Sequence, residues 1–259
     1  MSTRIHTLSL ALAAALATLA APAQALGTGD LAFTAFNADE DGFAMLSFVD
    51  IAAGTTLYFG DNEWTGSAFN TGESYLSWTT TSTVAAGTVV RFAAVDKTTL
   101  SASTGTLVRE AVSGSTNYGL SSSNETLYAY QGSSASAPST FIAAITNGSF
   151  SVDGPLTGTG LSEGSSNAIN LTTLATTATP DFAEYTGPRS GLSSFSAYQP
   201  LIANLANWTV DTTNGTYTST VPDTTAFTVS TVPEPEGWAM MAAGLGLLGL
   251  CGSRRRLPR

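Results

Sequence analysis

Alternating apolar and polar positions recur in short runs along the middle of this chain. Runs rich in Thr, Val, Phe and Tyr, bounded by Gly, Asn, Asp or Ser, predict strands, and no window between the two ends has a helical period. The stronger runs span residues 31–36, 43–49, 55–60, 74–78, 88–95, 106–112, 126–131 and 141–146, and weaker ones span 168–174, 208–211, 217–220 and 226–229. Many short, regularly spaced strands favour an all-β fold, an antiparallel β-sandwich. We expect its core to contain Phe33, Phe48, Phe59, Trp78 and Phe92.

The first 25 residues have a different pattern. Arg4 precedes an unbroken run of Ala, Leu, Ser and Thr over residues 8–21, and Ala23-Gln24-Ala25 follows. A basic start, a short apolar stretch and a small-x-small site are typical of a secretory signal peptide. We therefore expect cleavage after Ala25. The apolar run is short for a bilayer span of about 20 residues, which disfavours a transmembrane helix.

The other end has three parts in a fixed order. Pro233, Glu234 and Pro235 are followed by an apolar stretch from Trp238 to Cys251 and then by Arg254, Arg255 and Arg256. Trp suits a membrane interface, and the Arg cluster favours the cytoplasmic side. A helix over residues 238–252 would be roughly 22 Å long, short of a bilayer core of about 30 Å. Gly244, Gly246 and Gly249 would let another helix approach closely.

This tail, residues 232–259, resembles the PEP-CTERM sorting signal of Gram-negative bacteria. The resemblance implies export by the Sec machinery and transient insertion into the inner membrane. An exosortase, a membrane-embedded cysteine peptidase or transpeptidase, would recognise Pro233-Glu234-Pro235 and remove the tail. It also implies a place at the cell surface or in the extracellular matrix, with exopolysaccharide as a partner in biofilm or floc formation. The alternative is an ordinary tail anchor.

Residues 26–146 are similar to bacterial extracellular modules of the lamin-tail, immunoglobulin-like type. The similarity rests on residues 29–33, 43–50, 53–59, 61–64 and 119–132. It implies an immunoglobulin-like sandwich, a module that usually accompanies an enzyme. Residues 147–231 lie outside the similarity, and either complete the sandwich or form a Thr/Ser-rich β extension.

The composition restricts the chemistry of the exported part. His6 lies in the expected signal peptide and Cys251 in the apolar tail, and they are the only His and Cys of the 259 residues. Ser-His-Asp and Cys-His catalysis and most zinc sites require these side chains. Lys97, the single lysine, follows Asp96 and is typical of a solvated turn. We therefore expect no catalytic residues and no enzyme; a carboxylate-dependent glycan hydrolase stays an alternative.

The net charge disfavours nucleic acid as a partner. Residues 26–232 carry seventeen acidic side chains against four basic ones, a net charge of −13. The four basic residues are Arg91, Lys97, Arg109 and Arg189. Binding to nucleic acid or anionic lipid requires clusters of Lys and Arg.

Calcium is the one cofactor for which the sequence has candidate ligands. Asn37, Asp39 and Asp41 alternate before Gly42, as in a calcium loop, and Asp61 and Glu63 follow the third predicted strand. A site would form if the two loops met, which would suit a calcium-dependent carbohydrate-binding module. The loop lacks the Glu of an EF-hand at its twelfth position, Phe48, and an acidic hairpin turn explains the same residues.

Other residues suggest contact with sugars. Trp64, Tyr75, Tyr118 and Tyr198 lie near predicted loops, where exposed rings could stack on a glycan; core positions are the alternative. Asn-x-Ser/Thr sequons begin at Asn124, Asn147, Asn170, Asn207 and Asn214. Residues 132–139, rich in Ser, predict a flexible loop that could accept a glycan.

Overall fold

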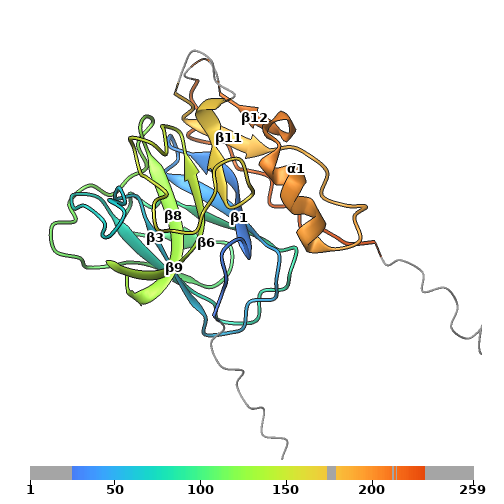
Figure 1. The fold of residues 1–259 in the computed structure, drawn as a ribbon, viewed down its shortest axis with the longest axis horizontal. Helices are drawn as coiled ribbons and strands as arrows, with labels where there is room; N and C mark the ends of the chain where they lie inside the picture. The colour runs from blue at the N-terminus through green and yellow to red at the C-terminus, as the bar shows by residue number, and fades with distance from the viewer. Residues whose placement is uncertain (1–24, 174–178, 212, 214, 231–259) are drawn as a thin grey trace, which may run out of the picture.

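Two sheets packed face to face form the molecule (Figure 1). The computed structural model describes residues 25–173, 179–211, 213 and 215–230. Ala23, Asn214 and the whole C-terminal tail with its Pro-Glu-Pro, Gly and Arg residues lie outside the described residues, as does the predicted C-terminal helix. The described part is an all-β sandwich, as the alternating pattern predicts.

The first sheet has the strand order β12-β11-β1-β2-β5-β6, and every neighbouring pair is antiparallel. Its strands are β1 (Leu31–Asn37), β2 (Gly42–Ser47), β5 (Val89–Ala93), β6 (Ser101–Ala102), β11 (Phe182–Tyr185) and β12 (Trp208–Val210). The strands at one edge therefore come from the last third of the chain.

The second sheet has the order β10-β9-β8-β3-β4-β7. It contains β3 (Thr56–Gly60), β4 (Tyr75–Thr79), β7 (Thr106–Arg109), β8 (Thr126–Ser134), β9 (Ala137–Thr146) and β10 (Ala168–Asn170). All pairs are antiparallel except β10 with β9, which is parallel. Residues after 147 thus contribute strands to both sheets.

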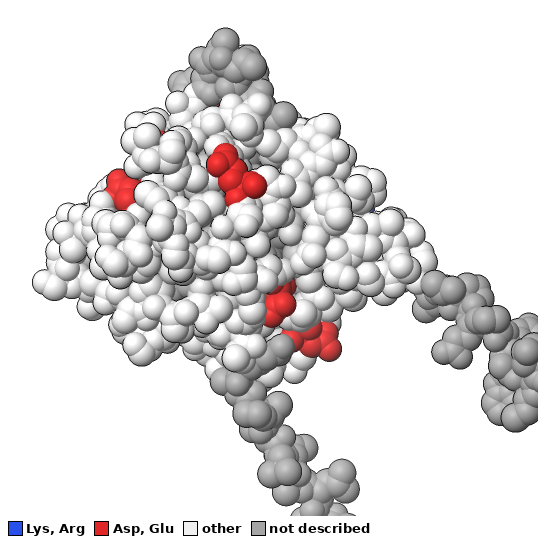
Figure 2. All heavy atoms as spheres, viewed as in Figure 1, with Lys and Arg blue, Asp and Glu red and all other residues white. Residues whose placement is uncertain are grey.

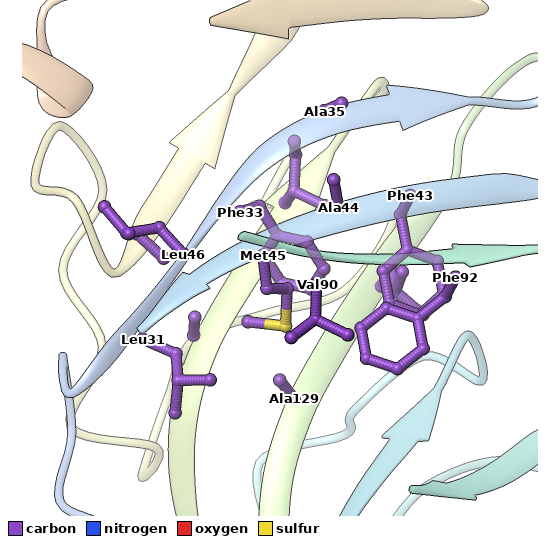
Figure 3. Packing of buried hydrophobic residues seen from close by; sticks show 14 of the residues in the cluster. Leu31, Phe33, Ala35, Phe43, Ala44, Met45, Leu46, Val90, Phe92 and Ala129 are labelled. Atoms are coloured by element: carbon purple, nitrogen blue, oxygen red, sulfur yellow. The ribbon is translucent and has the colours of Figure 1, made fainter. Parts of the chain in front are cut away.

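Aromatic rings fill the space between the sheets. Phe43 of β2 stacks on Phe92 of β5 at 4.8 Å and meets Phe59 of β3 edge-on at 4.9 Å. In Figure 3 these rings of the first sheet, with Met45 and Val90, point toward the strand that carries Ala129. Large rings that interlock in this way exclude water from both inner faces. All five core residues expected from the sequence are buried.

A bulge in β1 changes which residues face the core. Phe33 pairs with Met45, but Ala35 pairs with Ala44, so one extra residue, Thr34, lies on β1. An extra residue shifts the alternation by one position. Beyond the bulge Phe36 pairs with Phe43, and β1 is buried along its whole length.

The outer face of the second sheet carries its own aromatic cluster. Tyr128, Tyr130 and Phe141 of β8 and β9 pack with Phe69 and Trp64 from the loop after β3. The indole Nε1 of Trp64 donates a hydrogen bond to the carbonyl oxygen of Thr157, 2.9 Å away. Long loops thus cover a face that alternation alone would leave to solvent.

Apart from the edge strand β12, about the last forty described residues cover the first sheet. They contain the 3-10 turns η2 (Phe195–Tyr198) and η3 (Leu205–Asn207) around the five-residue helix α1 (Gln199–Ala203), which contacts β1. Tyr198, Ile202 and Phe227 are buried in the main core. Gly87 allows this approach: it has a φ of +87°, and a Cβ there would collide with the carbonyl of Phe227 and the ring of Phe195.

The structure corrects several sequence predictions. Residues 217–220 form a turn and residues 226–229 form only an isolated bridge from Val229 to Leu192, so the strands predicted there are wrong. The Ser-rich segment 132–139 is not a loop, because β8 and β9 pair almost to their tips across it. Strand β11, strand β6 and helix α1 have no counterpart in the prediction, since such short segments have too few positions to show a period. A further turn, η1 (Leu171–Thr173), ends the strand predicted over 168–174 at Asn170.

Candidate functional site

The residue that follows the predicted cleavage site is anchored in the core. Ala25 is exposed, whereas the side chain of Leu26 is 3% exposed and belongs to the main core. The backbone N–H of Leu26 donates to Oε1 of Gln131 at 2.8 Å. Among the described residues, Leu26 is therefore the first with a buried side chain.

The first predicted calcium loop is held by hydrogen bonds to backbone groups. Asn37 is fully buried, and its amide donates to the carbonyls of Tyr217 and Thr220. Asp39 Oδ2 accepts from the N–H of Tyr217 at 2.6 Å, and Asp41 Oδ1 accepts from the N–H of Leu120 at 2.8 Å. These side chains fasten the β1–β2 turn to two distant loops.

The carboxylates of the second predicted calcium loop also accept hydrogen bonds from other protein groups. Asp61 is 2% exposed, and its Oδ2 accepts from the hydroxyl of Ser74 at 2.9 Å. Glu63 accepts a hydrogen bond from the amide of Asn70. Within the described ranges, no group of three or more His, Cys, Asp or Glu side chains is placed to hold a metal ion. The structure does not bring the two loops together as such a group.

Buried carboxylates nevertheless gather around Asp61. Burial, reinforced by the carboxylate of Glu73, raises the pKa of Asp61 to about 8. Burial and then Glu63 raise the pKa of Glu73 to about 7, and burial and then Asp61 raise the pKa of Glu125 well above its usual value. Asp61 Oδ1 and Glu73 Oε2 have no hydrogen-bond partner among the described residues. Burial therefore favours the protonated form of the Asp61 carboxyl in the folded protein.

A second pair of buried acids lies beside the β1–β2 turn. Burial and the neighbouring Asp211 raise the pKa of Asp181 to about 6. Burial of Asp211 alone would raise its pKa, but hydrogen bonds from Asp181, Thr213 and Gly215 outweigh it and lower that pKa to about 2. Of the two carboxyls, Asp181 therefore holds a proton more tightly, and the negative charge is favoured on Asp211.

Three of the four predicted sugar-stacking rings are buried. Trp64, Tyr75 and Tyr198 are at most 7% exposed, and the hydroxyl of Tyr198 donates to the carbonyl of Thr228 at 2.6 Å. The stacking prediction is wrong for these rings, because long loops cover them. Tyr118 is 38% exposed, with the guanidinium of Arg109 4.3 Å above its ring.

All four basic side chains of the described part have partners. Arg91 pairs with Glu40, Lys97 pairs with Asp96, and Arg189 pairs with Asp223 at 3.2 Å. Arg109 donates to the backbone carbonyls of Val95 and Lys97. In Figure 2, acidic side chains form a few separate groups on a face that is otherwise almost uncharged. The described residues on this face form no cluster of Lys and Arg.

The sequons differ in accessibility. Asn124 is exposed, Asn170 and Asn207 are half-buried, and Asn147 is fully buried. The Asn147 amide accepts from the N–H of Glu125 and donates to the carbonyl of Ser121. A glycan therefore cannot be attached to Asn147 in the folded state.

Sequence reasoning missed a polar cavity beside α1. It has a volume of about 700 Å³ and is open to solvent. Three segments far apart in the chain line it, and their polar side chains are those of Thr28, Ser165, Ser166, Asn167, Gln199 and Asn204. None of its lining residues is charged. No sequence motif marks it, because tertiary contacts alone bring the three segments together.

The described part of the chain is an all-β sandwich that contains no His or Cys. A short tail follows it in the sequence. Residues 231–256 of that tail match the family model described as the PEP-CTERM protein-sorting motif. The chain thus carries the sorting signal of exosortase substrates, which implies export and a location at the surface or outside the cell. No curated protein and no solved structure matches the chain. The described residues contain no helix of the length and apolar character that a bilayer span needs.

Proposed function

We propose that the protein is a structural or adhesive component of an exopolysaccharide matrix, delivered by the exosortase route of a Gram-negative cell and active in biofilm or floc formation. The single observation that carries the proposal is the sorting motif at residues 231–256. It begins immediately after Ser230, whose N–H is hydrogen-bonded to the carbonyl of Leu192 at 2.8 Å. The folded sandwich would thus be the cargo that the tail delivers.

A non-catalytic role agrees with the side chains available. Burial raises the pKa of Asp61 and of Glu125, and both are 2% exposed, so a polymeric substrate cannot reach either carboxyl. Lys97, the remaining candidate base, is exposed and paired with Asp96 in a turn. The cargo would then act through its surface.

Processing is tested by changing one carboxyl of the Pro-Glu-Pro motif. Glu234→Gln in the full chain should slow removal of the tail, so that a heavier, membrane-associated form accumulates. Glu236→Gln makes the same chemical change two positions later and is the matched control. Intact mass spectrometry of membrane and extracellular fractions reads out both ends of the chain, including the predicted cleavage after Ala25.

Two outcomes would overturn the sorting proposal. One is equal maturation of Glu234→Gln, a deletion of residues 231–256 and the unchanged chain. The other is normal maturation in a host without its exosortase. The matrix role is tested separately: deleting the gene should reduce the exopolysaccharide retained on the cells, and unchanged retention would contradict that role.

A further inference from the structure

The cavity beside α1 has the chemistry of a site for a neutral, hydroxyl-rich ligand. Amide and hydroxyl side chains line it together with Pro200, Ala203 and two glycines. Its volume of about 700 Å³ lies within the range of about 300–1,000 Å³ typical of ligand pockets. A lining without charge does not favour a carboxylate, a phosphate or a cation.

Each of the three side-chain amides in the lining is held by hydrogen bonding through its oxygen or through its nitrogen. The other atom of the amide is left to bond a ligand. Gln199 Nε2 donates to the carbonyl of Gly29 at 3.1 Å, which leaves Oε1 as an acceptor. Asn167 Oδ1 accepts from Ser162 N and Ser165 Oγ, which leaves Nδ2 as a donor. Asn204 Oδ1 caps η3 by accepting from Ala206 N, so its Nδ2 is likewise a donor. These atoms have no hydrogen-bond partner among the residues that the structure describes.

Fixed donors and acceptors at one cavity match the hydroxyl groups of a sugar, each of which both donates and accepts. A peptide would instead require apolar pockets or an open strand edge, which this lining does not supply. A smaller cavity shares Gly164 and Ala203 with the first, and its own lining includes Glu163, whose carboxylate accepts a hydrogen bond from the Asn170 amide. Two hollows that share lining residues suit a ligand of more than one sugar unit.

We propose that this cavity binds a short segment of a neutral polysaccharide. The inference deepens the proposed function and rests on it in one respect, that the exported domain meets polysaccharide outside the cell. An open site without a stacked aromatic ring should bind weakly, with a Kd of about 1 mM, so retention in a matrix would depend on many such contacts.

The site can be tested on the sandwich within the full exported chain. Short oligosaccharides from a neutral glucan, a neutral mannan and a polyuronate are each titrated while backbone amide NMR signals are recorded. At least one neutral oligosaccharide should shift the signals of residues 28–29, 164–167 and 199–204, and the polyuronate should not. Shifts with the polyuronate alone, shifts confined to other residues, or no shifts with any oligosaccharide would overturn the proposal.

Two pairs of variants separate an effect on binding from an effect on folding. Asn204→Asp keeps the oxygen that caps η3 but replaces the donor and adds charge, so it should weaken binding by about tenfold. Asn117→Asp adds the same charge at an exposed site outside the cavity and should bind normally. Ala203→Trp should fill the cavity, whereas Ala206→Trp, exposed just beyond it, should not interfere. Equal affinities within each pair would contradict the assignment.

The outcome is independent of sorting. No binding, together with slowed processing of Glu234→Gln and normal processing of Glu236→Gln, would remove the sugar-site proposal alone. Normal binding with no exosortase dependence would remove the sorting proposal and leave the site in place.

Discussion

Single polar residues hold distant loops of this fold together. Asn37, Asp39 and Asp41 each bond the backbone of a loop far away in the sequence. A buried polar side chain with satisfied partners stabilises one specific arrangement, since any other would leave it without a hydrogen bond. These three residues, which resemble calcium ligands in the sequence, thus connect the β1–β2 turn to distant loops through hydrogen bonds.

Asp61 should make the stability depend on pH. Its folded pKa of about 8 lies above the usual 3.8, so the folded state holds a proton that the unfolded state loses near pH 4. The stabilisation is therefore full below about pH 4 and is lost as the pH rises toward about 8. We expect the free energy of unfolding to fall by about 2–4 kcal/mol between about pH 5 and pH 8.

Asp61→Asn should flatten this dependence, because the amide is neutral and its oxygen can still accept from Ser74. Urea unfolding across the pH range measures the effect. Asp50→Asn is the matched control: it removes an exposed carboxylate whose Oδ1 accepts from Ala86 N, a bond the amide can keep. An unchanged slope for Asp61→Asn would exclude Asp61 as the source.

The burial of the central strands depends on the segments that pack against their two faces. Strands β1 and β2 are buried throughout, because the second sheet covers one face and the segment around α1 covers the other. Phe227 is central to that cover: its ring lies 5.1 Å from Tyr198 and 5.7 Å from Tyr185, and its N–H donates to the carbonyl of Gly87.

Phe227→Ala should therefore lower the free energy of unfolding by about 3–5 kcal/mol. Val221→Ala, at a side chain that is 64% exposed, should cost about 0.5 kcal/mol or less. Chemical denaturation gives both values. Hydrogen exchange should also become faster in residues 195–203 of the Phe227 variant, and equal stability of the two variants would show that the cover contributes little.

At the scale of the whole molecule, the sandwich is built from both halves of the chain. β11 pairs with β1, and β10 pairs with β9, so the strands after residue 147 extend both sheets. Without them β1 would become an exposed edge, and the outer aromatic cover of the first sheet would be absent.

A chain of residues 26–146 should therefore not fold cooperatively, whereas residues 26–230 should. Thermal unfolding followed by circular dichroism, together with the dispersion of amide NMR signals, compares the two. A sharp transition and dispersed signals from residues 26–146 would show that this part is a domain in its own right.

The alternating residues of the chain predicted the sandwich, most of its strands and its inner aromatic core, because side chains in a strand alternate with a period of two and that signal is local. The sorting motif was equally readable, since its three parts follow one another along the sequence. The tertiary structure alone decided the parallel β10, the burial of Trp64 and Tyr198, the raised pKa of Asp61 and the polar cavity beside α1. Each of these depends on segments that meet only after folding, such as residues 28–29, 164–167 and 199–204, and no local pattern records which distant segments will cover a given face.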